Sequence, residues 1–116
     1  MRPESAKLLW DAREAAKAVR LFTDGVTKAR FFEDLLVRSA VERQLEIVGE
    51  ALVRLRRRDP ATADQVADAR KIIGMRNVIA HEYGDIDYET VWAVVDRYLA
   101  PLLVDLERLL SEPVAE

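Results

Sequence analysis

The sequence contains no cysteine, only four glycines and four prolines, and a single histidine among 116 residues. Without thiols the chain can form no disulfides, iron–sulfur clusters or zinc sites with thiolate ligands. The scarcity of turn residues, against many Ala, Leu, Val, Arg and Glu, favours helices over a β-sheet. No apolar run approaches the ~20 residues of a membrane span, and the amino terminus has no apolar signal-peptide core. We therefore expect an all-α protein that is soluble and cytoplasmic and has no membrane association.

The charge balance limits the partners of the chain. A formal net charge of −3 argues against a protein that coats nucleic acid, because such affinity comes from neutralising many phosphates. Any contact with RNA would have to be local. The basic residues Arg54 and 56–58 are more typical of a solvated helix end, where cations complement the helix dipole, than of a phosphate track. Half of the residues are apolar, so we expect residues 1–116 to form one domain with its own core.

The spacing of apolar residues predicts four helical segments, of which two lie in the first half of the chain. The first runs from about Glu4 to Leu21 and ends before a turn at Asp24-Gly25. The second runs without a break from about Thr27 to Arg58, and at ~1.5 Å per residue it should span roughly 45 Å. Its apolar positions alternate in steps of four and three, which gives a narrow buried seam.

The two later segments are marked by helix caps. Asp59 is a predicted cap before Pro60 at the first position of the third helix, which Gly84 can stop. Asp87 is a predicted cap for the fourth helix, which Pro101 should kink by removing a backbone donor. Four antiparallel helices with short connections make a four-helix bundle. Its predicted core consists of Leu8, Leu9, Ala12, Ala15, Ala16, Val19, Val41, Leu45, Val48, Leu52, Leu55, Val66, Ala69, Ile72, Ile73, Val78, Val91, Val95, Tyr98, Leu102, Leu106 and Leu109.

The only histidine, His81, lies in a segment that also carries Arg76, Asn77 and Tyr83. An imidazole exchanges a proton near neutral pH, a guanidinium binds a phosphate through two parallel hydrogen bonds, and a phenol is a donor and a modifiable nucleophile. An asparagine can help to position a phosphate. Together these residue types indicate chemistry on phosphate esters at the end of the third helix.

One straight helix does not bring all four residues together. Asn77 and His81 share one face of an ideal helix, whereas Arg76 and Tyr83 share another. Either the last turn loosens before Gly84, or the substrate lies across the helix end, or a second copy of the chain completes the site. Cleavage of RNA by its own 2′-hydroxyl without a metal needs a base and an acid, and one chain supplies one imidazole. A twofold homodimer would bring two copies of His81 to a shared cleft.

The spacing Arg76-Asn77-(three residues)-His81-Glu82-Tyr83 resembles the Arg-x4-His-x-Tyr motif of the HepT toxins, a branch of the HEPN superfamily of small helical ribonucleases. The resemblance covers nearly the whole chain and includes residues 31–36, 47–51, 73–75 and 87–92. One departure is the absence of the tryptophan expected one or two helical turns before Ile72, where this chain has Ala69 and Arg70.

The resemblance implies a HEPN-type four-helix fold and a homodimer that cuts RNA at its cleft without a metal or cofactor. It implies the toxin of a type VII toxin–antitoxin system, with Arg76 and His81 as catalytic residues. It also implies a minimal nucleotidyltransferase antitoxin as partner, which attaches AMP to Tyr83. A nucleotidyl group there adds negative charge and bulk close to His81, where it can pair with Arg76 and occupy the space of an RNA phosphate.

Each of these residues also has a purely structural interpretation. His81 can complement the helix dipole, and Arg76 can pair with Glu82 or with Glu50, which is otherwise expected to be solvated. Asn77 can cap or bridge helices, and Tyr83 can be a packing residue. Trp10, Trp92 and Tyr98 fall on apolar stripes and are expected to be core or dimer contacts, and the acidic residues Glu82, Asp85 and Asp87 are more typical of caps than of a metal site.

These interpretations leave two alternative functions open. The main alternative is a non-catalytic helical adaptor that binds a nucleotidyltransferase partner and cuts no RNA. The third possibility is a bundle that only dimerises, for which substitutions in the motif would change nothing except stability.

Overall fold

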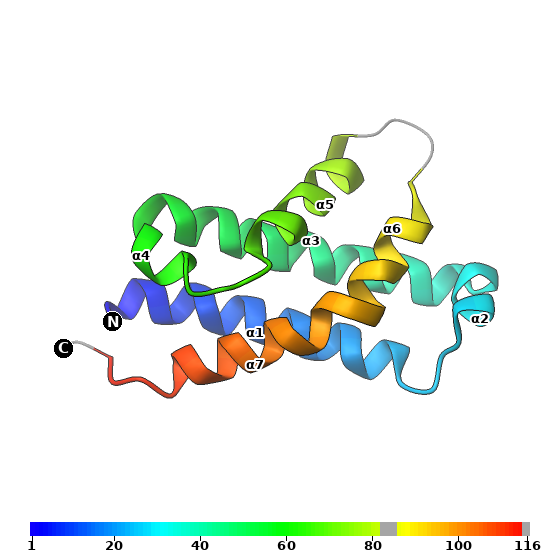
Figure 1. Cartoon of the computed structure of the whole chain (residues 1–116). Coiled ribbons are helices and arrows are strands. Elements are labelled where there is room, and N and C mark those ends of the chain that lie inside the picture. The colour runs from blue at the N-terminus through cyan, green and yellow to red at the C-terminus, as the bar shows by residue number, and fades with distance from the viewer. Residues whose placement is uncertain (82–85, 115–116) are drawn as a thin grey trace.

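The computed structural model describes residues 1–81 and 86–114, with side chains for residues 1–75 and 86–114. All regular secondary structure in these ranges is helical (Figure 1), which confirms the predicted all-α bundle. The elements are α1 (Pro3–Thr23), α2 (Lys28–Glu33), α3 (Leu35–Arg58), α4 (Pro60–Ala63), α5 (Ala69–His81), α6 (Tyr88–Ala93), a π-helical turn (Val94–Tyr98) and α7 (Leu99–Leu110).

The bundle is built around α1, which packs along α3 and along α7, while α5 packs on α3 (Figure 1). Asp24 and Gly25 form the predicted turn after α1, where Gly25 has a φ of 70° that favours glycine. The core predictions are confirmed for most described positions. Only four predicted core residues are partly buried, and they still pack against the core: Leu8, Ala69, Val95 and Tyr98. The predicted core position Val78 lies among the residues whose side chains are not described.

The prediction of an unbroken helix over residues 27–58 is wrong, because the chain breaks at Asp34. This residue has an extended backbone, with φ −105° and ψ 96°, and it ends α2 and caps α3. Its carboxylate accepts a hydrogen bond from the Val37 N–H at 3.1 Å. The break allows α2 to turn and bury Phe31 completely, with its ring 5.2 Å from that of Trp92 on α6. The free energy gained by burying the Phe31 side chain thus outweighs the free energy lost by breaking the helix at Asp34.

The third predicted helix is also divided, into α4 and α5, with residues 64–68 outside any helix. Side chains of α7 bind the backbone of this connection in place of helical hydrogen bonds. The Asp105 carboxylate accepts from the Ala67 N–H at 3.0 Å, and the Arg108 guanidinium donates to the Gln65 carbonyl at 3.1 Å. The helix that carries the motif is therefore shorter than predicted and has its own direction. The predicted stop at Gly84 lies outside the described residues.

The last helix is interrupted, as predicted, but by a π turn just before Pro101. The Leu99 N–H donates to the Val94 carbonyl, a five-residue step that places both side chains in the core. Pro101 has no N–H for the carbonyl four residues earlier, so the regular hydrogen-bond pattern cannot continue through this stretch. Figure 1 shows the change of direction between α6 and α7.

Asp59 joins the start of α1 to the start of α4. Its carboxylate accepts hydrogen bonds of 2.6 Å from the hydroxyls of Ser5 and Thr62 and caps α4 through the Thr62 N–H, as predicted. Ser5 is buried, with 2% of its surface exposed. The hydrogen bonds from Ser5 and then Thr62 hold the pKa of Asp59 below its ordinary value of 3.8.

The replacement Asp59→Ala is expected to lower the free energy of unfolding by about 2 kcal/mol at neutral pH, because it removes a cap and leaves a buried hydroxyl without its acceptor. A carboxyl whose pKa is depressed by folding stabilises the protein above its unfolded pKa, and this contribution is lost as pH falls through the folded pKa. In urea titrations the difference between wild type and variant should therefore shrink below pH 3.8. Replacement of an exposed carboxylate, Asp64→Ala, serves as control. If the stability difference between wild type and Asp59→Ala stayed the same in acid, the lowered pKa of Asp59 would be contradicted.

Candidate functional site

Arg76, Asn77 and His81 lie on α5, whose helical backbone is unbroken to His81. Ile72, Ile73 and Met75 are buried on the side that packs on α3. Loosening of the last turn, one of the three alternatives given above, is therefore not seen up to His81. The side chains of Arg76, Asn77 and His81 are not described, and Tyr83 lies outside the described residues altogether.

One stripe of α5 faces away from α3. Arg70 and Gly74 are exposed, and a Cβ built on Gly74 would meet no atom within 4 Å. The steps from position 70 to 74, 77 and 81 are four, three and four residues, the spacing of one helix face. Helical register therefore places positions 77 and 81 on the same stripe as Arg70 and Gly74. The residue types of the motif do not indicate that Arg70 and Gly74 belong to the candidate site. Their spacing from positions 77 and 81 is visible in the sequence and could have shown it.

The start of α6 is held by a cluster of Arg38, Glu42 and Tyr88. The Tyr88 hydroxyl donates to the Glu42 carboxylate at 2.8 Å, and the Arg38 guanidinium lies 4.9 Å from the centre of the Tyr88 ring. Burial, followed by the bond to Glu42, raises the pKa of Tyr88. Asp87 caps α6, as predicted, through the N–H groups of Glu89 and Thr90. This cluster fixes the chain where it leaves the segment that carries the motif.

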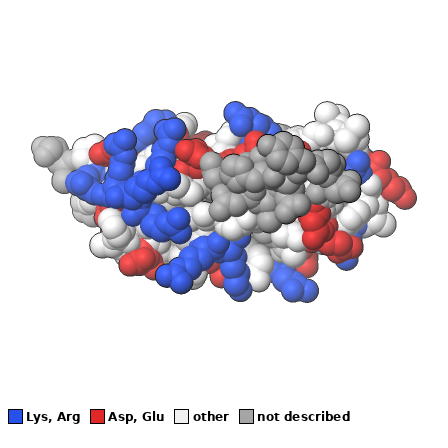
Figure 2. Space-filling model, turned by 90° about the horizontal axis from the view of Figure 1, so that it is seen from above, with Lys and Arg blue, Asp and Glu red and all other residues white. Residues whose placement is uncertain are grey.

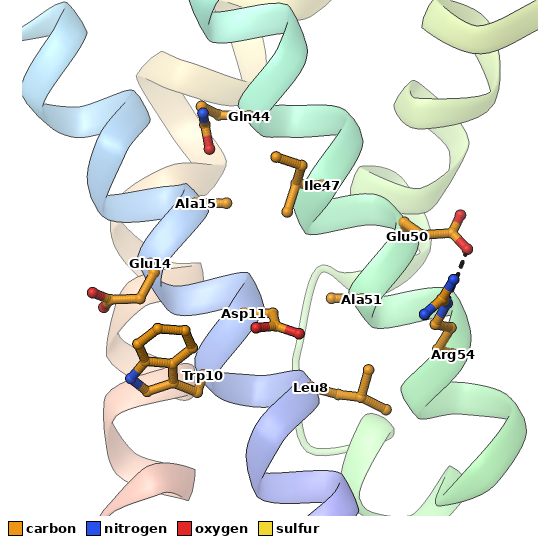
Figure 3. A pocket seen from close by; sticks show the side chains of 10 residues that line it. All are labelled: Leu8, Trp10, Asp11, Glu14, Ala15, Gln44, Ile47, Glu50, Ala51 and Arg54. Carbon is orange, nitrogen blue, oxygen red and sulfur yellow. Dashed lines mark hydrogen bonds and ion pairs between the residues drawn. The ribbon is translucent and has the colours of Figure 1, made fainter.

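A groove of about 380 Å³ lies between α1 and α3 (Figure 3). Its lining residues are Leu8, Trp10, Asp11, Glu14, Ala15, Gln44, Ile47, Glu50, Ala51 and Arg54. In Figure 3, Glu50 and Arg54 lie on the side of α3 away from α1, and the Glu50 carboxylate accepts from the Arg54 guanidinium at 3.2 Å. Three carboxylates line the groove against one guanidinium, so it is a poor site for an RNA phosphate.

The aromatic residues divide between core and surface. Trp10 is 45% exposed, so it is not a core residue, and Lys7 lies 4.8 Å from the centre of its ring. Trp92 is partly buried against Phe31. Tyr98 is partly buried, and its hydroxyl accepts a hydrogen bond from Lys71 at 3.2 Å. A dimer contact therefore stays the prediction for Trp10.

Two further observations apply to the described residues alone. None of their helices combines the length and the apolar character that a membrane crossing requires. Their acidic side chains form no group of three that could bind a metal ion. Of the acidic residues near the motif, Asp87 is a helix cap, and Glu82 and Asp85 lie outside the described ranges.

The chain is similar to known proteins over most of its length. A family model described as "Ribonuclease HepT-like" matches residues 12–109. A protein of Methanocaldococcus jannaschii named "Putative RNase" is 31% identical over 85% of this chain and 90% of its own length. A second M. jannaschii protein of the same designation is 25% identical over 90% of this chain and 85% of its own length. One from Caldanaerobacter subterraneus is 27% identical over 76% of this chain and 78% of its own length. No solved structure gives a significant match. The chain therefore belongs to the HepT-like ribonuclease family.

Proposed function

We propose that this protein is the toxin of a type VII toxin–antitoxin system, a metal-independent endoribonuclease that acts as a homodimer of single-domain protomers. Membership of the HepT-like family supports ribonuclease activity. The observation that carries the site assignment is the unbroken helical backbone of α5 through His81. It keeps positions 77 and 81 one helical turn apart, on the stripe that begins with the exposed Arg70 and Gly74.

The reaction follows from the chemistry of the three residues. A His81 imidazole takes the proton of the RNA 2′-hydroxyl, and the resulting oxygen attacks the adjacent phosphorus. Arg76 stabilises the extra charge of the pentacoordinate phosphorane, and Asn77 positions the phosphate. The bond to the 5′-oxygen then breaks, and that oxygen receives a proton from a second imidazole. The products are a 2′,3′-cyclic phosphate and a free 5′-hydroxyl.

A homodimer supplies the second imidazole, because each chain contains one histidine. Apolar surface is available for such an interface. Leu35 and Leu36 at the start of α3 are 65% and 79% exposed. They lie beside α2, which packs on both α3 and α6 (Figure 1), and a second copy that covered them would contact this end of the bundle.

Control of the toxin is assigned to Tyr83. A minimal nucleotidyltransferase partner would attach AMP to its phenol oxygen, with loss of pyrophosphate from ATP. The added phosphate lies two residues from His81 in sequence, where it can bind Arg76 in place of the RNA phosphate.

The test is incubation of the purified protein with single-stranded RNA in the presence of excess EDTA. We expect cleavage at the rate found without EDTA, and fragments that carry 2′,3′-cyclic phosphate and 5′-hydroxyl ends by mass spectrometry. A ribonuclease of known magnesium dependence serves as control for metal removal. Cleavage that disappears in EDTA and returns with added magnesium would contradict the metal-independent mechanism.

A further inference from the structure

A hollow of about 380 Å³ lies between the second half of α3, α4 and the start of α5. Its floor includes the buried side chains of Leu52, Val66 and Ile73. The remaining lining residues are Arg56, Ala63, Asp64, Ala67, Asp68, Ala69, Arg70 and Lys71. Its volume falls within the range of small-ligand sites, and its floor is apolar while charged residues form its rim.

The rim of the hollow is positively charged. Arg56 and Arg70 are exposed, and neither forms an ion pair with another described side chain. Lys71 is held in place by Tyr98, with its ammonium 4.8 Å from the ring centre. These three cations face two carboxylates, those of Asp64 and Asp68, which leaves one positive charge in excess. Figure 2 shows basic side chains gathered at the end of this face where α4 and the end of α3 lie.

The exposed stripe of α5 connects this rim to the motif. Arg70 begins the stripe and position 81 ends it, at ~16 Å for a rise of ~1.5 Å per residue. Between them stands Gly74, although glycine in an exposed helix is less stable than alanine. A Cβ at Gly74 would meet no described neighbour within 4 Å, so packing within the described part of the chain does not require glycine there. Glycine at this position allows a molecule outside the chain to approach the helix backbone closely.

We propose that the hollow and its cations form a subsite for the RNA strand beside the cleaved phosphate, an inference that rests on the ribonuclease function proposed above. Arg56 and Arg70 bind backbone phosphates, a base lies on the apolar floor, and the strand passes over Gly74 toward His81. A second copy of the chain fits this surface less well. A twofold contact would bring like-charged rims together, which costs free energy, whereas an anionic strand neutralises them.

The test uses an RNA that cannot be cleaved, because its 2′-hydroxyls are methylated, and compares wild type with Arg56→Gln/Arg70→Gln. We expect the variant to bind at least about tenfold more weakly and the slope of log affinity against log salt to fall by about two, one for each lost phosphate contact. With cleavable RNA, KM should rise while kcat at saturation stays near the wild-type value. Arg57→Gln, on the same helix end but outside the hollow, should behave as wild type.

A second variant, Gly74→Leu, separates RNA from a second copy as the occupant. The side chain enters open space, so the melting temperature should hold, RNA binding should weaken, and the mass in light scattering should stay that of wild type. A change in oligomeric mass would overturn the proposal in favour of an interface between copies. If the double variant bound RNA with the affinity of wild type, the subsite would be overturned, whereas the proposed nuclease function would stand. If the double variant bound RNA more weakly but the wild-type protein cut no RNA, the subsite would stand and only the proposed catalytic function would be overturned.

Discussion

His81→Ala is expected to lower the rate of RNA cleavage by at least about a hundredfold, because it removes both the imidazole that accepts the 2′-hydroxyl proton and the imidazole that protonates the leaving oxygen. No other histidine in the chain can take over this role. The rate is measured as single-turnover cleavage with saturating enzyme, so that a change in RNA affinity does not contribute. The far-UV circular dichroism and melting temperature should match those of wild type.

Tyr83→Phe is the matched control for this experiment. It lies in the same segment, and in the absence of the partner it should cleave RNA as wild type does. Cleavage that survives His81→Ala would contradict the mechanism. The helical adaptor would be favoured by two results together. Arg76→Ala/His81→Ala would still bind the partner, and the wild-type protein would neither cut RNA nor slow growth.

Co-expression with a minimal nucleotidyltransferase partner is expected to add the mass of one AMP to the chain and to abolish cleavage. The phosphate introduced at Tyr83 competes with RNA for Arg76, and the adenosine fills space beside His81. Intact-mass spectrometry measures the adduct, and a growth assay in the same cells measures the toxicity. Tyr83→Phe should carry no adduct and should stay toxic in the presence of the partner.

Tyr88→Phe is the matched tyrosine control. The Tyr88 hydroxyl is bound to Glu42, so this variant should still receive AMP and be neutralised. An adduct that persists in Tyr83→Phe would move the modification to another residue. Toxicity that is suppressed without any adduct would mean that the partner acts by binding alone.

The sequence predicted the long helices well because their burial follows local periodicity. Val41, Leu45 and Val48 repeat at helical spacing, and each is fully buried in the structure. The breaks at Asp34 and over residues 64–68 were missed for a different reason. Both depend on contacts with the distant last third of the chain, through Trp92 at the first break and Asp105 at the second. No window of neighbouring residues contains that information.

For the candidate site too, some features follow from the local sequence and others depend on contacts between distant segments. The lone histidine and its neighbours could be identified from composition and spacing, and the helical backbone of α5 agrees with the register assumed for Asn77 and His81. The hollow could not be predicted, because it exists only once α4 and α5 have both packed against the second half of α3. Arg56 is exposed in the last turn of α3, as expected, and the structure also places it on the rim of the hollow with Arg70.

The proposed mechanism requires that two protomers share one catalytic cleft. It is tested most directly by the cleavage rate of a purified heterodimer with one wild-type chain and one His81→Ala chain, isolated through two different affinity tags. If each reaction uses an imidazole from both protomers, the heterodimer should be nearly as inactive as the His81→Ala homodimer. A heterodimer that retains about half of the wild-type rate would mean that each chain acts alone, and it would contradict the shared cleft.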